Sequence, residues 1–155
     1  MFRILAVAAL AFVAPPAVAA DLSVTDAYAR SGNPNTAAAF MSVANAGDTP
    51  DRLVEARSDV ARKTELHTHV ISDGIARMRP VDAIEVPAGG EARLERGGDH
   101  VMFIGLHEPL APGETFPLEL VFESGRSLTV ELTVEGPGDG MGHGGGMGHG
   151  GAAPE

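Results

Sequence analysis

Four side chains with soft donor atoms stand at a defined spacing in the middle of this chain. They are His67, Met78, His100 and Met102, in the pattern H-x10-M-x21-H-x-M. Two imidazoles and two thioethers with no thiolate form a soft ligand set, and the ion that such a set suits best is Cu(I). The spacing therefore predicts a Cu(I) site with these four side chains as ligands.

The same two ligand types recur near the C-terminus, in two copies of Gly-Met-Gly-His. The candidate ligands there are Met141, His143, Met147 and His149. Imidazoles bind Cu(II) and thioethers prefer Cu(I), so this segment is a candidate site for either ion. Residues 136–155 are mostly glycine and are expected to be disordered without metal. The segment either gathers copper for the folded site, at a raised effective concentration, or only solubilises the chain.

The first twenty residues have the features of a secretory signal peptide. Arg3 precedes an apolar run over residues 4–13, and Ala17-Val18-Ala19 offers a cleavage site, so we expect cleavage near residue 19 or 20. The alternative is a retained membrane anchor, but the apolar run is short and Pro15-Pro16 stands directly behind it. The sequence therefore predicts a periplasmic protein that does not insert into the membrane after cleavage.

Composition excludes several classes of function. Without residues 1–20, 10 basic residues remain against 21 acidic ones, for a formal charge of −11. Such a surface repels nucleic acid and anionic lipid. The chain has no cysteine. It therefore has no Cys nucleophile, zinc-thiolate site, iron–sulfur cluster or blue-copper centre. No Ser-His-Asp constellation is evident either, so we expect no enzyme activity.

Residues 21–135 are predicted to form one all-β domain. Short runs rich in Val, Ile, Leu and Phe alternate with turn-forming residues, which is typical of an antiparallel sandwich or barrel. The expected strands are residues 22–28, 37–44, 52–57, 65–70, 75–79, 83–86, 92–94, 100–106, 116–122 and 127–134.

A hairpin is expected to bring the first two ligands together. If residues 71–74 form a four-residue loop, Val70 pairs with Ile75 and His67 lies directly opposite Met78. His69 shares the side of the strand that carries His67, so it is a spare ligand or a surface histidine.

The other two ligands stand on one strand. His100 and Met102 are two residues apart, so both point to the same side and can bind one ion. Gly97-Gly98-Asp99 precedes them, which predicts that His100 lies near a loop and near solvent.

Residues 52–122 resemble the PCuAC family of exported copper chaperones, also called DUF461. All four positions of the family motif H(M)-x10-M-x21-H-x-M match, and the flanking residues match too. The matching segments are Glu65-Leu66-His67, Met78-Arg79-Pro80-Val81, Pro87-Ala88-Gly89-Gly90, Gly97-Gly98-Asp99-His100-Val101-Met102, and Gly105-Leu106 to Pro109-Leu110. The chain departs from the family at Ala76, where many relatives carry a further methionine, and at Arg96, where a proline is frequent.

The resemblance implies a cupredoxin-like antiparallel Greek-key β-sandwich or barrel that holds one Cu(I) near its surface. It also implies delivery of copper to the Cu_A or Cu_B centre of a respiratory haem-copper oxidase, beside a Sco-like thioredoxin-fold partner. We expect a monomer, with a copper-mediated dimer as the alternative. Two other interpretations stay open: a copper-sequestering resistance protein, and a metal-free secreted interaction module.

Overall fold

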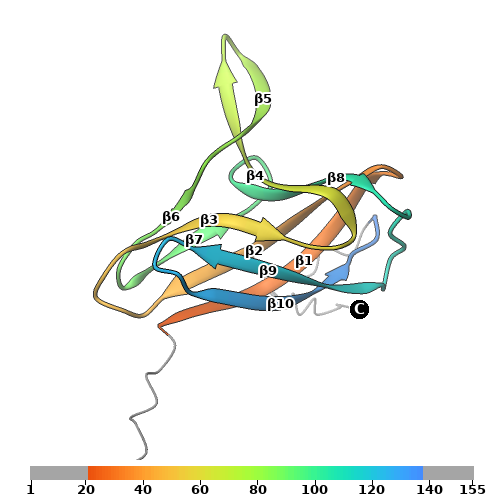
Figure 1. The fold of residues 1–155 in the computed structure, drawn as a ribbon. Helices are drawn as coiled ribbons and strands as arrows, with labels where there is room; N and C mark the ends of the chain where they lie inside the picture. The colour runs from red at the N-terminus through yellow and green to blue at the C-terminus, as the bar shows by residue number, and fades with distance from the viewer. Residues whose placement is uncertain (1–20, 138–155) are drawn as a thin grey trace, which may run out of the picture.

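The computed structural model describes residues 21–137, which form ten β-strands (Figure 1). They are β1 (Leu22–Asn33), β2 (Thr36–Asn45), β3 (Asp51–Arg57), β4 (Ala61–Ser72), β5 (Ile75–Pro80), β6 (Ile84–Val86), β7 (Gly90–Leu94), β8 (His100–Leu106), β9 (Thr115–Phe122) and β10 (Ser127–Val134). The all-β prediction is confirmed, and all ten expected strands are present. Over these residues the chain forms no helix that could cross a membrane.

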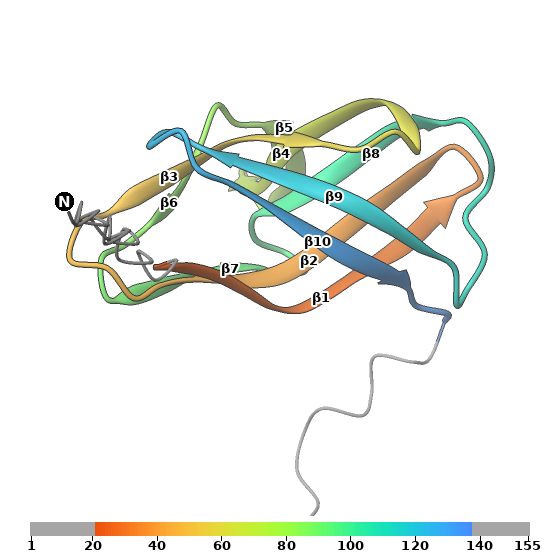
Figure 2. The same ribbon diagram turned by 60° about the horizontal axis from the view of Figure 1, so that its bottom comes forward.

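The strands form one sheet that folds into two facing layers (Figure 2). Their order is β5-β4-β8-β2-β1-β10-β9-β3-β6, and β7 pairs with β2 beyond the end of β8. Every pairing is antiparallel except that of β1 with β10, which is parallel. The expected antiparallel sandwich therefore contains one parallel pair, which joins its first and last strands. Side-chain alternation shows which residues face the core but not which distant strands pair, so it could not reveal this contact between the first and last strands.

The core lies between the two layers. In β8, Val101 and Phe103 point inward and are fully buried. The ring of Phe103 meets the ring of Phe116 from β9 edge to face, with centroids 5.3 Å apart. Met41 of β2 is also buried there, as its apolar surroundings in the sequence indicate. Because strand residues alternate, the side chains between these core residues must face outward.

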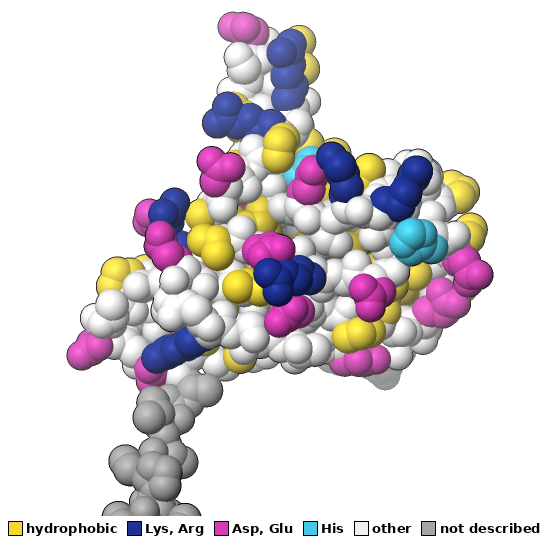
Figure 3. Space-filling model, viewed as in Figure 1, with side chains coloured by type: hydrophobic (Ala, Val, Ile, Leu, Met, Phe, Trp, Pro, Cys, Tyr) yellow, Lys and Arg dark blue, Asp and Glu magenta, His cyan; other side chains and the backbone are white. Residues whose placement is uncertain are grey.

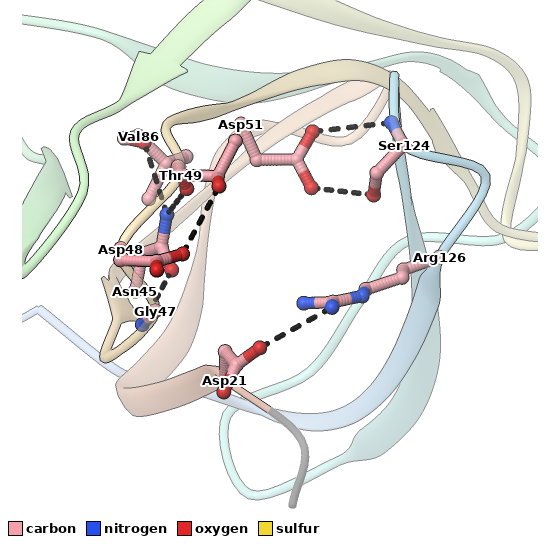
Figure 4. A network of polar contacts seen from close by, with 9 residues as sticks. All are labelled: Asp21, Asn45, Gly47, Asp48, Thr49, Asp51, Val86, Ser124 and Arg126. Atoms are coloured by element: carbon pink, nitrogen blue, oxygen red, sulfur yellow. Dashed lines mark hydrogen bonds and ion pairs between the residues drawn. The ribbon is translucent and has the colours of Figure 1, made fainter. Parts of the chain in front are cut away.

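A polar network fixes one end of the sandwich (Figure 4). Asp51, at the start of β3, accepts hydrogen bonds from the Ser124 hydroxyl (2.5 Å) and from the backbone N–H groups of Ser124 and Arg52. Burial raises the pKa of Asp51, but these hydrogen bonds outweigh burial and the net pKa is lowered. An ionised Asp51 therefore ties β3 to the turn between β9 and β10.

The hairpin of β4 and β5 projects from the body of the sandwich (Figure 1). Asp73 and Gly74 form its turn with φ angles of 53° and 75°. Two consecutive positive φ angles define a type I′ turn, whose twist matches that of a two-stranded ribbon. Residues 71–80 are all exposed, and β5 is the edge strand of the sheet.

Candidate copper site

A cleft of about 470 Å³ lies on the outer face of the β4–β8–β2 layer, on the side away from the core. Four side chains with metal-binding donor atoms line it: His69, Met78, His100 and Met102. Three of them are ligands expected from the motif, brought together from β5 and β8. Phe40 of β2 lines the same cleft and is buried, so the cleft has an aromatic floor.

The hairpin register differs from the expected one. The turn contains two residues and not four, so Ser72 pairs with Ile75, His69 pairs with Met78, and His67 pairs with Pro80. The prediction that His67 lies directly opposite Met78 is therefore wrong. The register shift is two residues, and a two-residue shift keeps every side chain on its predicted face. His67, His69 and Met78 consequently still share the outer face.

His100 is 2% exposed, which corrects the expectation that it lies near solvent. It stands in the middle of the sheet, where it pairs with His67 of β4 and its ring lies 6.1 Å from that of Phe40. Its Nδ1 atom is 3.1 Å from the carbonyl oxygen of Gly98. Because a carbonyl only accepts, Nδ1 carries the proton, and Nε2 keeps the lone pair that a metal needs.

Glu65 orients His67 in a comparable way. The Nε2 atom of His67 is 3.0 Å from the Glu65 carboxylate, so Nε2 donates and Nδ1 keeps its lone pair. That Nδ1 atom is buried and has no hydrogen-bond partner. A carboxylate that holds the far nitrogen of an imidazole is a common arrangement around metal-binding histidines. The hydrogen bond to His67 is also the main cause that lowers the pKa of Glu65.

The sequence left open whether His69 is a spare ligand or a surface histidine. Its ring lies 5.4 Å from that of His100, whereas the ring of His67 lies 5.9 Å away. It lines the cleft, which His67 does not, and its Nδ1 atom is also buried without a partner. The sequence indicated that His69 is a candidate ligand, because His67 and His69 share one side of the same strand.

The donor set fits a soft metal ion. Within residues 21–137, no three His, Asp or Glu side chains are grouped so that they could hold a metal by themselves. Beside the imidazoles, the cleft offers the thioethers of Met78 and Met102 as donors. Thioethers favour Cu(I) over harder ions. Leaving a buried imidazole nitrogen unpaired costs about 1–3 kcal/mol, and metal ligation would remove this cost.

His100 should stay neutral at lower pH than an ordinary histidine. Burial is the main cause that lowers its pKa from 6.5; the hydrogen bond to Gly98 opposes this, and His69 and His67 add to it. Between the lowered pKa and 6.5 the unfolded chain binds a proton that the folded chain does not. The contribution of His100 to the stability of the apo-protein therefore falls as the pH drops through this window.

An NMR titration of the His100 ring in the apo-protein should give a midpoint below 6.5. Phe40→Ala should raise the midpoint, because it removes part of the apolar cover of the ring. A wild-type midpoint at or above 6.5 would show that burial does not control this imidazole.

Comparisons with known proteins agree with this fold. The copper-bound PCuAC domain from PmoF2 is 25% identical, with a TM-score of 0.63 over 76% of this chain and 95% of that one. The Cu(I) form of DR1885 from Deinococcus radiodurans is 39% identical, with a TM-score of 0.59 over 76% of this chain and 81% of that one. The fold is that of a PCuAC domain, as the sequence resemblance indicated.

The family follows from a match to residues 22–134. These residues fit the model of the LpqE-like lipoproteins, and the chain belongs to that LpqE-like family. Lipoprotein Lxx21020 of Leifsonia xyli subsp. xyli (strain CTCB07) is 31% identical over 122 residues, which are 78% of this chain and 74% of that protein. The expected signal peptide and the tail ligands Met141, His143, Met147 and His149 lie outside the described residues.

Proposed function

We propose that this protein is an exported copper chaperone that binds one Cu(I) and delivers it to a respiratory haem-copper oxidase. The proposed ligands are His67, Met78, His100 and Met102. The observation that supports this most is the convergence of Met78, His100 and Met102 on one cleft. The fold that carries the cleft is shared with domains whose structures hold copper.

The two ends of the site differ in exposure, and this difference suits a carrier. His100 is buried and held by Gly98, whereas Met78 is 53% exposed on the edge strand β5. An acceptor can therefore reach the ion first from the side of Met78 and replace the ligands one at a time. Acceptor thiolates bind Cu(I) more strongly than thioethers do, so transfer to a thiolate site is downhill.

The proposed location is the periplasm, after removal of residues 1–20. Relatives in a lipoprotein family support an exported protein associated with the cell envelope. None of the 155 residues is a cysteine, so the chain offers no thiol for a lipid within that length.

The function is tested by loading the protein with Cu(I) and mixing it with the purified apo-domain of oxidase subunit II. We expect stoichiometric transfer, detected as copper that elutes with the acceptor when the two proteins are separated under anaerobic conditions. Met102→Ala should bind Cu(I) less tightly and serves as the control for the role of the cleft. Tight Cu(I) binding with no transfer would favour copper sequestration over delivery, and an absence of Cu(I) binding would favour a metal-free interaction module.

His67→Ala should lower the Cu(I) affinity by at least roughly 10-fold, and His69→Ala should lower it less. The reason is that Glu65 already holds His67 in a ligating tautomer, and a loss of roughly 10- to 100-fold occurs even when only such support around a metal is removed. Competition with a chromogenic Cu(I) chelator measures both variants. A larger loss in His69→Ala would assign the second imidazole to His69, which lines the cleft.

We further propose that the tail gathers copper for the folded site through Met141, His143, Met147 and His149. The chain leaves the sandwich beside the cleft, because the cleft-lining Arg30 donates a hydrogen bond to the carbonyl of Gly136 at 3.1 Å. Because the tail begins at this point, its ligands would reach the cleft at a raised effective concentration. Deleting residues 138–155 should lower the copper stoichiometry and slow loading of the cleft from Cu(II) with a reductant. Unchanged stoichiometry and loading would leave the tail a solubilising role only.

A further inference from the structure

The projecting hairpin carries most of the exposed apolar side chains of the described domain. Within residues 21–137, four large hydrophobic side chains are exposed, and three of them belong to this hairpin. They are Ile71 (76% exposed), Ile75 (54%) and Met78 (53%). Ile71 pairs with Ala76, next to the pair of His69 and Met78 on the same side of the ribbon. An apolar strip therefore runs from the copper cleft toward the tip of the hairpin.

The same hairpin carries arginines that have no acidic partner. Six of the ten Lys and Arg side chains in the described part of the chain form ion pairs with Asp or Glu. Arg77 and Arg79 of β5 form none there, and neither does Arg96, which lines the copper cleft. Figure 3 shows Lys and Arg side chains gathered on the projecting hairpin. In a chain with a net charge of −10, this is a local reversal of sign next to the proposed site.

We propose that a docking surface, formed by the projecting hairpin and Arg96, binds the protein that exchanges copper with the cleft. Ile71 and Met78 lie on the side of the ribbon that carries His69, whereas Ile75, Arg77 and Arg79 lie on the other side, so the partner contacts both sides of the hairpin. The proposal rests on the proposed delivery function and adds the chemistry of the partner. The partner has carboxylates around its copper-accepting site and a small apolar patch that covers Ile71 and Met78. Charge complementarity selects such a partner, because none of the three arginines forms an ion pair with a carboxylate within residues 21–137.

Docking here places the acceptor at the exposed end of the cleft. Met78 belongs both to the docking surface and to the cleft, so contact with the hairpin brings acceptor ligands to the most accessible copper ligand. Attraction between the arginines and an acidic partner speeds encounter at low ionic strength and weakens as salt is added. A separate role for charges on an edge strand is to block pairing with other strands, and any charged residue fulfils it. The test must therefore replace the arginines with residues of the opposite charge, which still block pairing with other strands.

The experiment measures the rate of Cu(I) transfer to the apo-domain of oxidase subunit II in a stopped-flow instrument at increasing salt. The double variant Arg77→Glu/Arg79→Glu should transfer about 10-fold more slowly than wild type at low salt, and the difference should shrink at high salt. Arg77→Lys/Arg79→Lys should stay within about 2-fold of wild type, because the charge is kept. Arg52→Glu/Arg93→Glu changes the net charge equally on β3 and β7, which do not pair with β5, and should have little effect.

Chelator competition controls for the site itself, since neither Arg77 nor Arg79 is a ligand and Cu(I) affinity should not change. Equal transfer rates for wild type and the charge-reversed hairpin would overturn this inference alone. A failure of wild type to transfer copper at all would overturn the delivery function and this inference with it. Sedimentation showing a dimer that the hairpin reversal dissociates would also overturn it, because the occupant would then be a second copy of this chain.

Discussion

Replacing His100 with alanine should lower the affinity of the protein for Cu(I) by roughly 100-fold or more. Losing residues that merely orient a metal ligand costs 10- to 100-fold, so that range is a lower bound for the ligand itself. His100 is also the most rigidly held of the candidates. It is buried in the sheet between His67 and Phe40, and its hydrogen bond to Gly98 fixes the ring so that Nε2 is free.

Cu(I) competition titrations at pH 7 would measure this loss. His107→Ala is the matched control, because His107 is exposed just after β8 and does not line the cleft. An affinity for His100→Ala within about 3-fold of wild type, well short of the loss expected for a ligand, would remove the cleft as the copper site. Thermal unfolding of the apo-variant should be recorded alongside, so that loss of copper binding is not confused with loss of the fold.

Phe103→Ala should destabilise the apo-domain by about 3–5 kcal/mol, the range typical of a buried phenylalanine cut to alanine. Phe103 is fully buried and its edge-to-face contact with Phe116 joins the two layers. It also lies between Met102 and Ile104 on β8, so its burial determines which side of this strand faces outward. The loss of free energy should therefore come with weaker Cu(I) binding.

Urea unfolding monitored by circular dichroism would measure this change. Phe103→Leu should cost clearly less, because most of the apolar volume is kept. A loss below about 1 kcal/mol for Phe103→Ala would mean that the two layers are not held together at this contact.

The strands and the choice of ligand types could be predicted from local sequence. Strand β8 begins at His100 and ends at Leu106, and β10 runs from Ser127 to Val134, both as the alternation of apolar residues indicates. The outward direction of His67, Met78 and Met102 is set by the same alternation, which tertiary contacts do not alter. The soft, cysteine-free donor set is likewise a property of composition.

The register, the depth of His100 and the part played by His69 could not be predicted in this way. Asp73 and Gly74 can belong to a two-residue or a longer turn, and only the paired ribbon decides between them. A glycine pair before His100 suggested a surface position, but strands β4 and β2 on either side bury it.

Local sequence was enough to predict that this chain is all-β and that two imidazoles and two thioethers stand at a spacing that suits one copper ion. The fold was needed to show that His69 lines the cleft, that Glu65 holds His67, and that Arg77 and Arg79 form no ion pair within residues 21–137. The two groups of features differ in how far apart along the chain the interacting residues lie. Alternation and donor chemistry are properties of neighbouring residues, whereas burial, tautomer and charge balance depend on strands that meet only after folding.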